Sequence, residues 1–200
     1  MTRLGMTIDL KRCIGCFGCT IACKAENATP PKVFWNRVLV NEEGKYPTAR
    51  QVFFPIQCNH CQEAPCLRVC PSGATHQRAD GIVLIDYDKC VGCRACMTAC
   101  PYQQRSFLRQ IGTYYPGHLT DFERVGYAKY PIKTVTKCTF CAHRVDEGLE
   151  PACVQTCITK ARNFGDLDDP ESAVCLAMRN RHSFTLRSEL GTLPSVIYLG

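Results

Sequence analysis

The fold is decided by the stretch Asp86-Tyr-Asp-Lys-Cys90-Val-Gly-Cys93-Arg-Ala-Cys96-Met-Thr-Ala-Cys100-Pro101. Its four cysteines have the spacing C-x2-C-x2-C-x3-C-P, which holds a [4Fe-4S] cluster in bacterial-type ferredoxins. Gly92 allows the backbone to curl tightly, so that three closely spaced thiolates can converge on one cluster. Because the fourth cysteine of such a run ligates a second cluster, the stretch predicts a partner motif elsewhere in the chain.

Three further cysteine groups can supply that partner. The first group repeats the opening stretch at a constant offset of 77 residues, with identities at Asp9, Cys13, Gly15, Cys16, Cys19, Ala22 and Cys23. The second group, from Cys58 to Pro71, has the spacing C-x2-C-x4-C-x3-C-P, and the fourth runs from Cys138 to Cys157 and echoes the second at an offset of 87 residues. Self-similarity of this kind indicates internal duplication.

The order of the groups predicts how they pair. Groups two and three adjoin and form an inner ferredoxin-like unit over residues 58–101, so groups one and four remain to pair around it. The outer unit then comprises residues 1–57 and 102–200, with insertions at 24–57 and 102–137. We expect an α+β fold of two bacterial-ferredoxin-like 2[4Fe-4S] units, one nested inside the other, with a β-hairpin insertion.

In a two-cluster ferredoxin, the last cysteine of each group binds the cluster held by the first three cysteines of the partner group. Applied to both pairs of groups, this rule predicts four ligand sets. They are Cys13, Cys16, Cys19 and Cys157 for cluster a; Cys58, Cys61, Cys66 and Cys100 for cluster b; Cys90, Cys93, Cys96 and Cys70 for cluster c; and Cys138, Cys141, Cys153 and Cys23 for cluster d. These sets use sixteen of the 17 cysteines as iron ligands. The one left over, Cys175, is interpreted as a small buried apolar residue.

Other side chains near the cysteines receive supporting roles. Because each cluster already has four thiolates, His60 and His143 are interpreted as donors toward cluster sulfur or as surface residues. The basic residues that flank the clusters can raise reduction potentials through their charge; they are Arg94, Arg68, Lys24 and Lys137.

Zinc and disulfides are the competing interpretations of so many cysteines. A structural zinc site usually joins two C-x2-C pairs across a longer loop, whereas groups one and three place four cysteines within eleven residues. Group four alone is more ambiguous. An odd cysteine count and the lack of a secretory signal pattern at the N-terminus argue against a disulfide framework.

Between the cysteine groups the sequence predicts short elements. Residues 1–9 read as a strand, 33–40 and 51–54 as a hairpin that packs Trp35 and Phe53 into a core, and 74–77 and 82–85 as a second hairpin. Residues 102–137 are either a partner-facing excursion or a surface connector. Asp169 is expected to cap a last helix, with Pro170 at its first position, that runs to about Asn180.

Charge and motifs restrict the function. The formal charge of +6 treats every cysteine as neutral; with sixteen thiolates on four oxidised clusters it becomes about −2, which removes the electrostatic case for nucleic acid. There is no P-loop, dinucleotide fingerprint or nucleophile–base constellation. The longest stretch free of charged residues, 51–62, is too short to span a bilayer. The chain is therefore expected to carry electrons and to catalyse no reaction by itself.

The combined motifs resemble the four-cluster iron–sulfur subunit of the dimethyl sulfoxide reductase and polysulfide reductase family. The similar segments are Cys23-Lys-Ala-Glu-Asn27, Cys58 through Ala74, Asp86 through Tyr102, Lys137 through Cys141 with Pro151-Ala-Cys153, and Gly165 through Pro170. Group three is complete here, which implies a [4Fe-4S] cluster where some relatives have [3Fe-4S]. Groups one and four carry Lys24 and Ile158 in place of the proline after the last cysteine.

The resemblance implies a relay between two partners. One would be a large molybdenum or tungsten bis-pterin catalytic subunit, and the other an integral-membrane, quinone-linked subunit. The chain would then lie peripheral to the membrane through its partners, on a side that is undetermined. Two alternatives are a soluble ferredoxin-type carrier for a cytoplasmic hydrogenase or formate dehydrogenase, and a zinc-stapled interaction scaffold.

Overall fold

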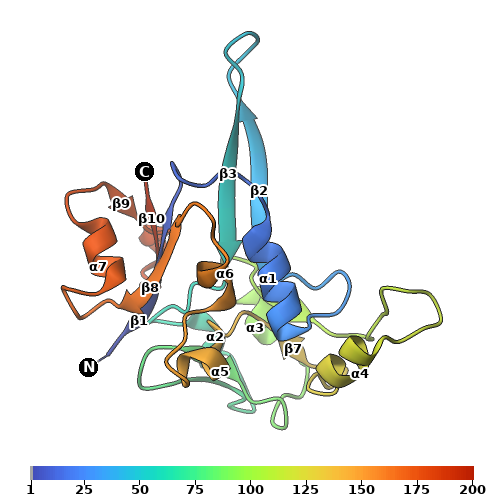
Figure 1. The fold of residues 1–200 in the computed structure, drawn as a ribbon. Helices are drawn as coiled ribbons and strands as arrows, with labels where there is room; N and C mark the ends of the chain where they lie inside the picture. The colour runs from blue at the N-terminus through green and yellow to red at the C-terminus, as the bar shows by residue number, and fades with distance from the viewer. Residues whose placement is uncertain (1) are drawn as a thin grey trace.

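The computed structural model describes residues 2–200 as a mixed α/β chain (Figure 1). Its largest sheet has four strands in the order β8-β1-β10-β9: Arg162–Asp166, Leu4–Asp9, Val196–Leu199 and Ser183–Phe184. β1 is parallel to β10 and antiparallel to β8. The predicted N-terminal strand is thus confirmed over Leu4–Asp9, while Met1 lies outside the described residues. The sheet joins the two ends of the chain.

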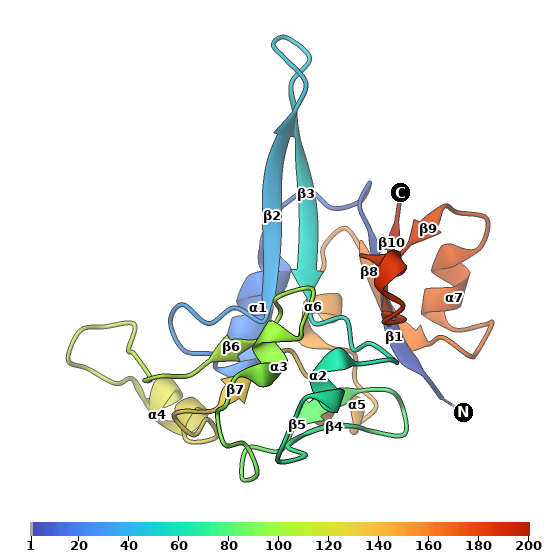
Figure 2. The same ribbon diagram turned by 180° about the vertical axis from the view of Figure 1, so that it is seen from behind.

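Short helices follow the cysteine loops. They are α1 (Gly18–Asn27) in group one, α2 (Pro65–Arg68) in group two, α3 (Ala95–Thr98) in group three, and α5 (Ala142–Val145) and α6 (Ala152–Gln155) in group four. α1 packs against α6, and α2 packs against α3. Both views show the two helix pairs in different parts of the molecule (Figures 1 and 2). Group one therefore meets group four, and group two meets group three.

A long hairpin projects from this body (Figure 2). It consists of β2 (Asn36–Glu43) and β3 (Arg50–Gln57), which pair antiparallel along their whole length. The predicted hairpin is confirmed, but its first strand begins and ends three residues later than predicted, its second strand is longer, and its tip lies at residues 44–49. Trp35 is buried as expected, whereas Phe53 is only half-buried. Its ring covers Gly15 in the first cysteine group, so it packs against the cysteine loop and not in the core.

The second predicted hairpin is also present, as β4 (Thr75–Gln77) paired with β5 (Val83–Ile85). Residues 102–137, predicted as an excursion or a surface connector, contain regular secondary structure. β6 (Ser106–Phe107) pairs with β7 (Val135–Thr136), and α4 (Asp121–Tyr127) lies between them. Thr120 and Glu123 form a reciprocal capping box at the start of α4, which fixes where this helix begins.

The last helix differs from its prediction. α7 spans Ala173–Met178, and its N-cap is Ser172, whose hydroxyl accepts a hydrogen bond from the Cys175 backbone N–H. Asp169 instead accepts the Glu171 N–H within a turn that precedes the helix. The prediction of an Asp169 cap was wrong because Asp followed by Pro is as suitable for a turn as for a helix start.

The core contains the middle of β1 and β10 together with the loops that carry the cysteines. Met6, Ile8, Val196 and Tyr198 are fully buried there. Of residues 2–200, no helix has the length and apolarity that a membrane crossing requires.

Candidate iron–sulfur site

The cysteine loops repeat their backbone conformation as well as their sequence. Gly15 and Gly92, at the same position of the repeat, have φ of +68° and +66°. Phe17 and Arg94, also equivalent, are left-handed residues that precede α1 and α3. At Gly92 a Cβ would lie 2.0 Å from the Lys133 carbonyl oxygen. The expected tight curl around Gly92 is therefore confirmed, and it requires glycine for both its φ and its space.

Two pockets are each lined by one predicted ligand set. Cys13, Cys16, Cys19 and Cys157 line one of them, and Cys70, Cys90, Cys93 and Cys96 line the other. Each pocket combines three cysteines of one group with the last cysteine of its partner group. Cys16 and Cys93 are the two exposed cysteines among the seventeen, so both pockets lie near the surface.

The other two sets lie deeper. Burial raises the pKa of the Cys61 thiol to about 12, and the neighbouring Cys58, Cys66 and Cys100 add to this shift. Burial likewise raises the pKa of Cys23, whose sulfur neighbours are Cys153 and Cys141. Thiols with raised pKa values are deprotonated when they bind a metal, which displaces the proton. The cysteines of two sets therefore line one pocket each, and the thiols of the other two sets interact electrostatically within their own set.

The two deep sets meet at a junction. Cys138 interacts electrostatically with Cys58 of the other set as well as with its own Cys23 and Cys153. Two residues after each of these first cysteines, His60 and Phe140 stack with ring centroids 3.8 Å apart and planes inclined by 19°. The junction therefore joins equivalent positions of groups two and four.

His60 is almost completely buried at this junction. Its Nδ1 accepts the backbone N–H of Val83 at 3.1 Å, and burial together with the charges of Lys137 and Arg105 lowers the pKa of the imidazole well below its usual value. His60 is thus a buried, neutral imidazole, which contradicts the predicted surface role. Because Nδ1 accepts a hydrogen bond, the proton lies on Nε2, which is buried without a partner among residues 2–200; the role of donor toward cluster sulfur stays a prediction. His143 does lie at the surface, where Nε2 contacts Glu26 at 2.7 Å.

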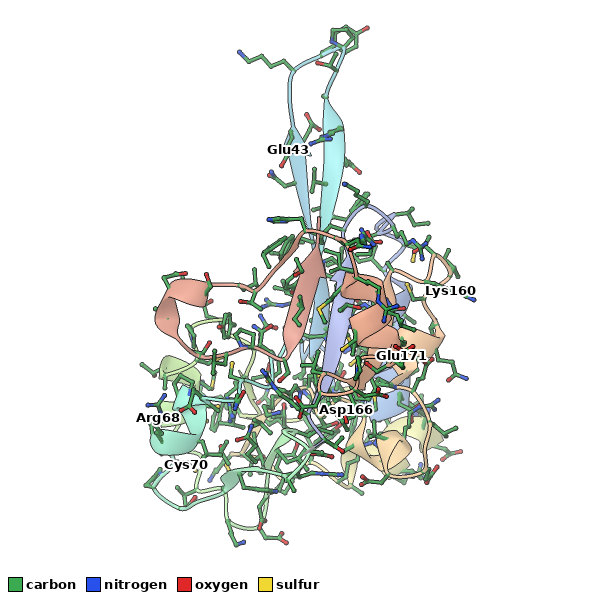
Figure 3. The ribbon with its side chains drawn as sticks, turned by 90° about the vertical axis from the view of Figure 1, so that its left-hand side faces the viewer. Glu43, Arg68, Cys70, Lys160, Asp166 and Glu171 are labelled. Carbon is green, nitrogen blue, oxygen red and sulfur yellow. The ribbon has the colours of Figure 1, made fainter. Side chains whose placement is uncertain are left out.

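The flanking basic residues have different environments. Lys137 is buried, and its ammonium donates to the carbonyls of Val83 and Cys138. Lys24 donates to the Val33 carbonyl at 2.9 Å. The Arg94 guanidinium lies over the Phe107 ring, 4.7 Å from its centroid, and Arg68 is exposed beside Cys70 (Figure 3). Only Lys137 is therefore a buried charge.

Three polar residues next to the sulfurs were missed in the sequence. Arg162 Nη2 lies 3.7 Å from Cys19 Sγ and its Nη1 3.9 Å from Cys153 Sγ. Arg105, also buried, lies beside Cys66 and Cys96 and opposes the burial that raises the pKa of both thiols. Asn27 Nδ2 lies 3.8 Å from the sulfurs of both Cys23 and Cys141. A pattern of cysteines does not contain these residues, so it could not identify them.

Cys175 also differs from its prediction. It is half-exposed, and its thiol contacts the carbonyl oxygens of Leu167 at 3.5 Å and Asp166 at 3.8 Å. It therefore packs at the edge of α7 as a weak hydrogen-bond donor and not in the core.

The donor set fits an anionic iron–sulfur group. Besides four thiols per set, buried N–H groups next to the cysteines have no acceptor among residues 2–200, including Arg105 Nη2 and Asn36 Nδ2. Asn36 itself contacts Arg162 through its Oδ1. Buried donors of this kind normally have a partner, and sulfides would provide acceptors beside them. Within the same residues, no three His, Cys, Asp or Glu side chains are grouped so that they could hold a single metal ion.

Comparison with known proteins gives consistent results. The family described as "4Fe-4S dicluster domain" matches residues 49–114 and 124–167. An iron–sulfur subunit assigned to a dimethyl sulfoxide reductase of Halobacterium salinarum is 46% identical over all of this chain and 79% of its own length. The iron–sulfur subunit ArrB of a Shewanella arsenate respiratory reductase is 40% identical over 98% of this chain and 96% of its own. A selenate reductase subunit of Mesobacillus selenatarsenatis is 44% identical, with 97% and 70% covered.

Proposed function

Because the chain belongs to the 4Fe-4S dicluster family and is an iron–sulfur electron-transfer subunit, we propose that it holds four [4Fe-4S] clusters in one linear relay. The ligands would be the four sets of cysteines a to d named above. The observation that supports this proposal most directly is that sets a and c each line one pocket, three cysteines from one group and the last from its partner. Electrostatic interactions within sets b and d support the same pairing.

The proposed relay has the order a, d, b, c. Arg162 contacts a cysteine of set a and one of set d, which supports their adjacency. The closeness of Cys138 and Cys58 supports a step from d to b, and Arg105 beside Cys66 and Cys96 supports a step from b to c. The exposed Cys16 and Cys93 would then mark the two ends, where electrons enter and leave.

The proposed domains follow the same pairing. Groups two and three, residues 58–101, would form an inner ferredoxin-like unit, and the outer unit would comprise residues 1–57 and 102–200. The contacts of α1 with α6 and of α2 with α3 support this division, as does the joining of β1 to β8 and β10. Nesting would place the junction of His60 and Phe140 between the two units.

The proposed partners are a molybdenum or tungsten bis-pterin catalytic subunit and a quinone-linked membrane subunit. Relatives named as subunits of arsenate, selenate and tetrathionate reductases support the first partner. The membrane partner rests on the family resemblance, as does a location at the membrane surface through partner subunits. The similarity to reductase subunits favours this function over a soluble carrier for a hydrogenase.

Anaerobic purification of the chain from its native membranes tests the proposal. We expect about sixteen iron and sixteen sulfide per chain, for four clusters of the [4Fe-4S] type, and co-isolation of a large pterin-containing subunit. Bound zinc, or iron for only two clusters, would contradict the four ligand sets. A chain that remains in the soluble fraction without a pterin subunit would contradict the partners and leave the ligand sets unaffected.

A further inference from the structure

Two buried arginines occupy equivalent places in the two cysteine pairs. Arg105 follows Cys100 by five residues, and Arg162 follows Cys157 by five residues. Each of these cysteines is the last of its group. The side chains are only 6% and 3% exposed, respectively. Their common spacing from a last cysteine and their common burial indicate one structural role used twice.

Arg162 lies between two ligand sets. Its Nη2 is 3.7 Å from Cys19 Sγ of set a, and its Nη1 is 3.9 Å from Cys153 Sγ of set d. Asn36 Oδ1 accepts a further hydrogen bond from Nη2 at 3.2 Å, and Gln57 Oε1 accepts one from Nη1. These neutral acceptors hold the guanidinium plane in place between the sulfurs.

Arg105 lies between the other two sets. Its guanidinium interacts electrostatically with Cys66 and Cys58 of set b and with Cys96 of set c. Nη1 donates to Thr75 Oγ1 at 3.2 Å, and the Thr75 backbone N–H in turn donates to Cys70 Sγ of set c at 3.4 Å. The Nη2 donor has no partner among residues 2–200. Arg105 thus lies beside sulfurs of sets b and c, just as Arg162 lies beside sulfurs of sets a and d.

Neither arginine has a carboxylate partner in residues 2–200, whereas Arg78, Arg144 and Arg181 all form ion pairs there. An isolated guanidinium is costly to bury unless an opposite charge compensates it. The anions beside these two are the thiolates and the clusters that they would hold. The positive charge therefore acts on the clusters without being neutralised by protein.

We propose that Arg105 and Arg162 are fixed positive charges that each raise the reduction potentials of the two clusters between which they lie. One-electron reduction makes a four-thiolate cluster one unit more negative, and a fixed positive charge beside it stabilises the reduced state. Arg162 acts on clusters a and d, and Arg105 acts on clusters b and c. This inference rests on the four ligand sets of the proposed function.

The test compares midpoint potentials in the purified complex, by redox titration followed with EPR. Arg162→Gln is expected to lower two of the four midpoints, each by a tenfold change in the reduction equilibrium or more, which is 59 mV for a one-electron couple. Arg105→Gln is expected to lower the other two. The proposal is overturned if either variant keeps its clusters and moves no midpoint, or if both variants move the same pair.

Matched controls come from exposed basic residues that lie even closer in sequence to a ligand. Lys160 lies three residues from Cys157 and Arg68 lies two residues from Cys70, both exposed at the surface (Figure 3). Water and salt screen exposed charges, so Lys160→Gln and Arg68→Gln are expected to leave all four midpoints in place. Shifts as large as those of the buried variants would show that burial is not the cause and would overturn the proposal.

Lysine variants separate charge from hydrogen-bond geometry. Arg162→Lys and Arg105→Lys keep the charge but lose the planar fork of donors, and the proposal expects four clusters with unshifted midpoints. If a glutamine variant loses iron, the lysine variant at the same position distinguishes the two causes. Retained clusters with unshifted midpoints in the lysine variant support the role of charge. Loss of iron in the lysine variant as well overturns it. Iron and sulfide in the unsubstituted chain test the ligand sets separately, so failure of the two proposals is distinguishable.

Discussion

His60 and Phe140 stack with ring centroids 3.8 Å apart, and each lies two residues after the first cysteine of its group. Both rings are almost completely buried. The contact joins group two to group four, where Cys58 and Cys138 also approach each other. Packing at this point therefore holds together the two halves of the proposed relay.

Phe140→Ala tests the importance of this contact. Removal of a buried phenylalanine ring generally costs about 3–5 kcal/mol, so we expect the thermal midpoint of unfolding to fall by roughly 6–20 °C for a chain of this size. Differential scanning calorimetry under anaerobic conditions measures it. Phe122→Ala is the control, because Phe122 is 56% exposed and should change stability by no more than about 0.5 kcal/mol. Equal effects of the two would refute a role for the stack.

Cys100→Ser tests the crossing of the fourth cysteine. The proposed ligand sets place Cys100 with Cys58, Cys61 and Cys66, and the interaction of its sulfur with Cys61 supports that placement. We expect EPR of the variant to lose or alter the same signal as Cys58→Ser does and to keep the signal that Cys90→Ser removes. Cys175→Ser should leave every cluster signal unchanged. Loss of the Cys90-dependent signal in Cys100→Ser would show that group three keeps its own fourth cysteine.

Gly92→Ala tests the curl of the third group. The new Cβ would lie 2.0 Å from the Lys133 carbonyl oxygen, and φ at this position is +66°. Gly73 has the same φ of +66° with no atom within 4 Å of its Cβ position, so Gly73→Ala is a matched control. Both variants bear a left-handed cost of about 1–2 kcal/mol, but only Gly92→Ala adds a backbone clash. We expect iron analysis to show loss of one cluster in Gly92→Ala and full occupancy in Gly73→Ala.

The ion pair of Asp9 and Arg181 predicts a pH dependence of stability. Asp9 Oδ2 accepts from Arg181 Nη1 at 2.5 Å, and this hydrogen bond lowers the pKa of the carboxyl despite its burial. A carboxylate whose pKa is lower in the folded chain stabilises it above the unfolded value of about 3.9, and the contribution is lost as pH falls through the folded pKa. Asp9→Asn should therefore lower the unfolding midpoint at pH 7 and make less difference below pH 4.

Asp86 provides the control for this measurement. It is the equivalent residue of the repeat. Like Asp9, it accepts the backbone N–H groups two and three residues later, but its partner Lys89 is exposed. Screening by water makes such a pair weak, so Asp86→Asn should change the unfolding midpoint little at any pH. A pH profile in which the two variants behave alike would contradict a special contribution from Arg181.

The sequence predicts the parts of the structure that depend on local chemistry. Spacing of the cysteines and the glycines at 15 and 92 indicates the tight loops, and the 77-residue repeat predicts that both loops have one conformation. Alternation of apolar residues finds β1 and the two hairpins. These features depend on steric rules for a few neighbouring residues, so a single sequence is sufficient for them.

Interactions between distant residues were not predictable in the same way. An arginine five residues after a cysteine is unremarkable until its burial and its two sulfur neighbours are known, as at Arg162. His60 could have been a surface residue from the sequence alone, and only its stacking on Phe140 shows that it is buried. Ser172 and Asp169 are both good caps, and the tertiary packing of α7 against β8 decides between them. Each case depends on long-range contacts.

The position of β1 between β8 and β10 has a consequence for synthesis. Both edges of β1 have partners that lie more than 150 residues later in the chain, whereas β4 and β5, within residues 58–101, pair with each other. During translation both edges of β1 are at first unpaired, and unpaired strand edges can form hydrogen bonds with other chains. One edge of β1 can be paired after residue 166 has been made and the other only after residue 199, so residues 4–9 stay open to misassembly until synthesis is almost complete.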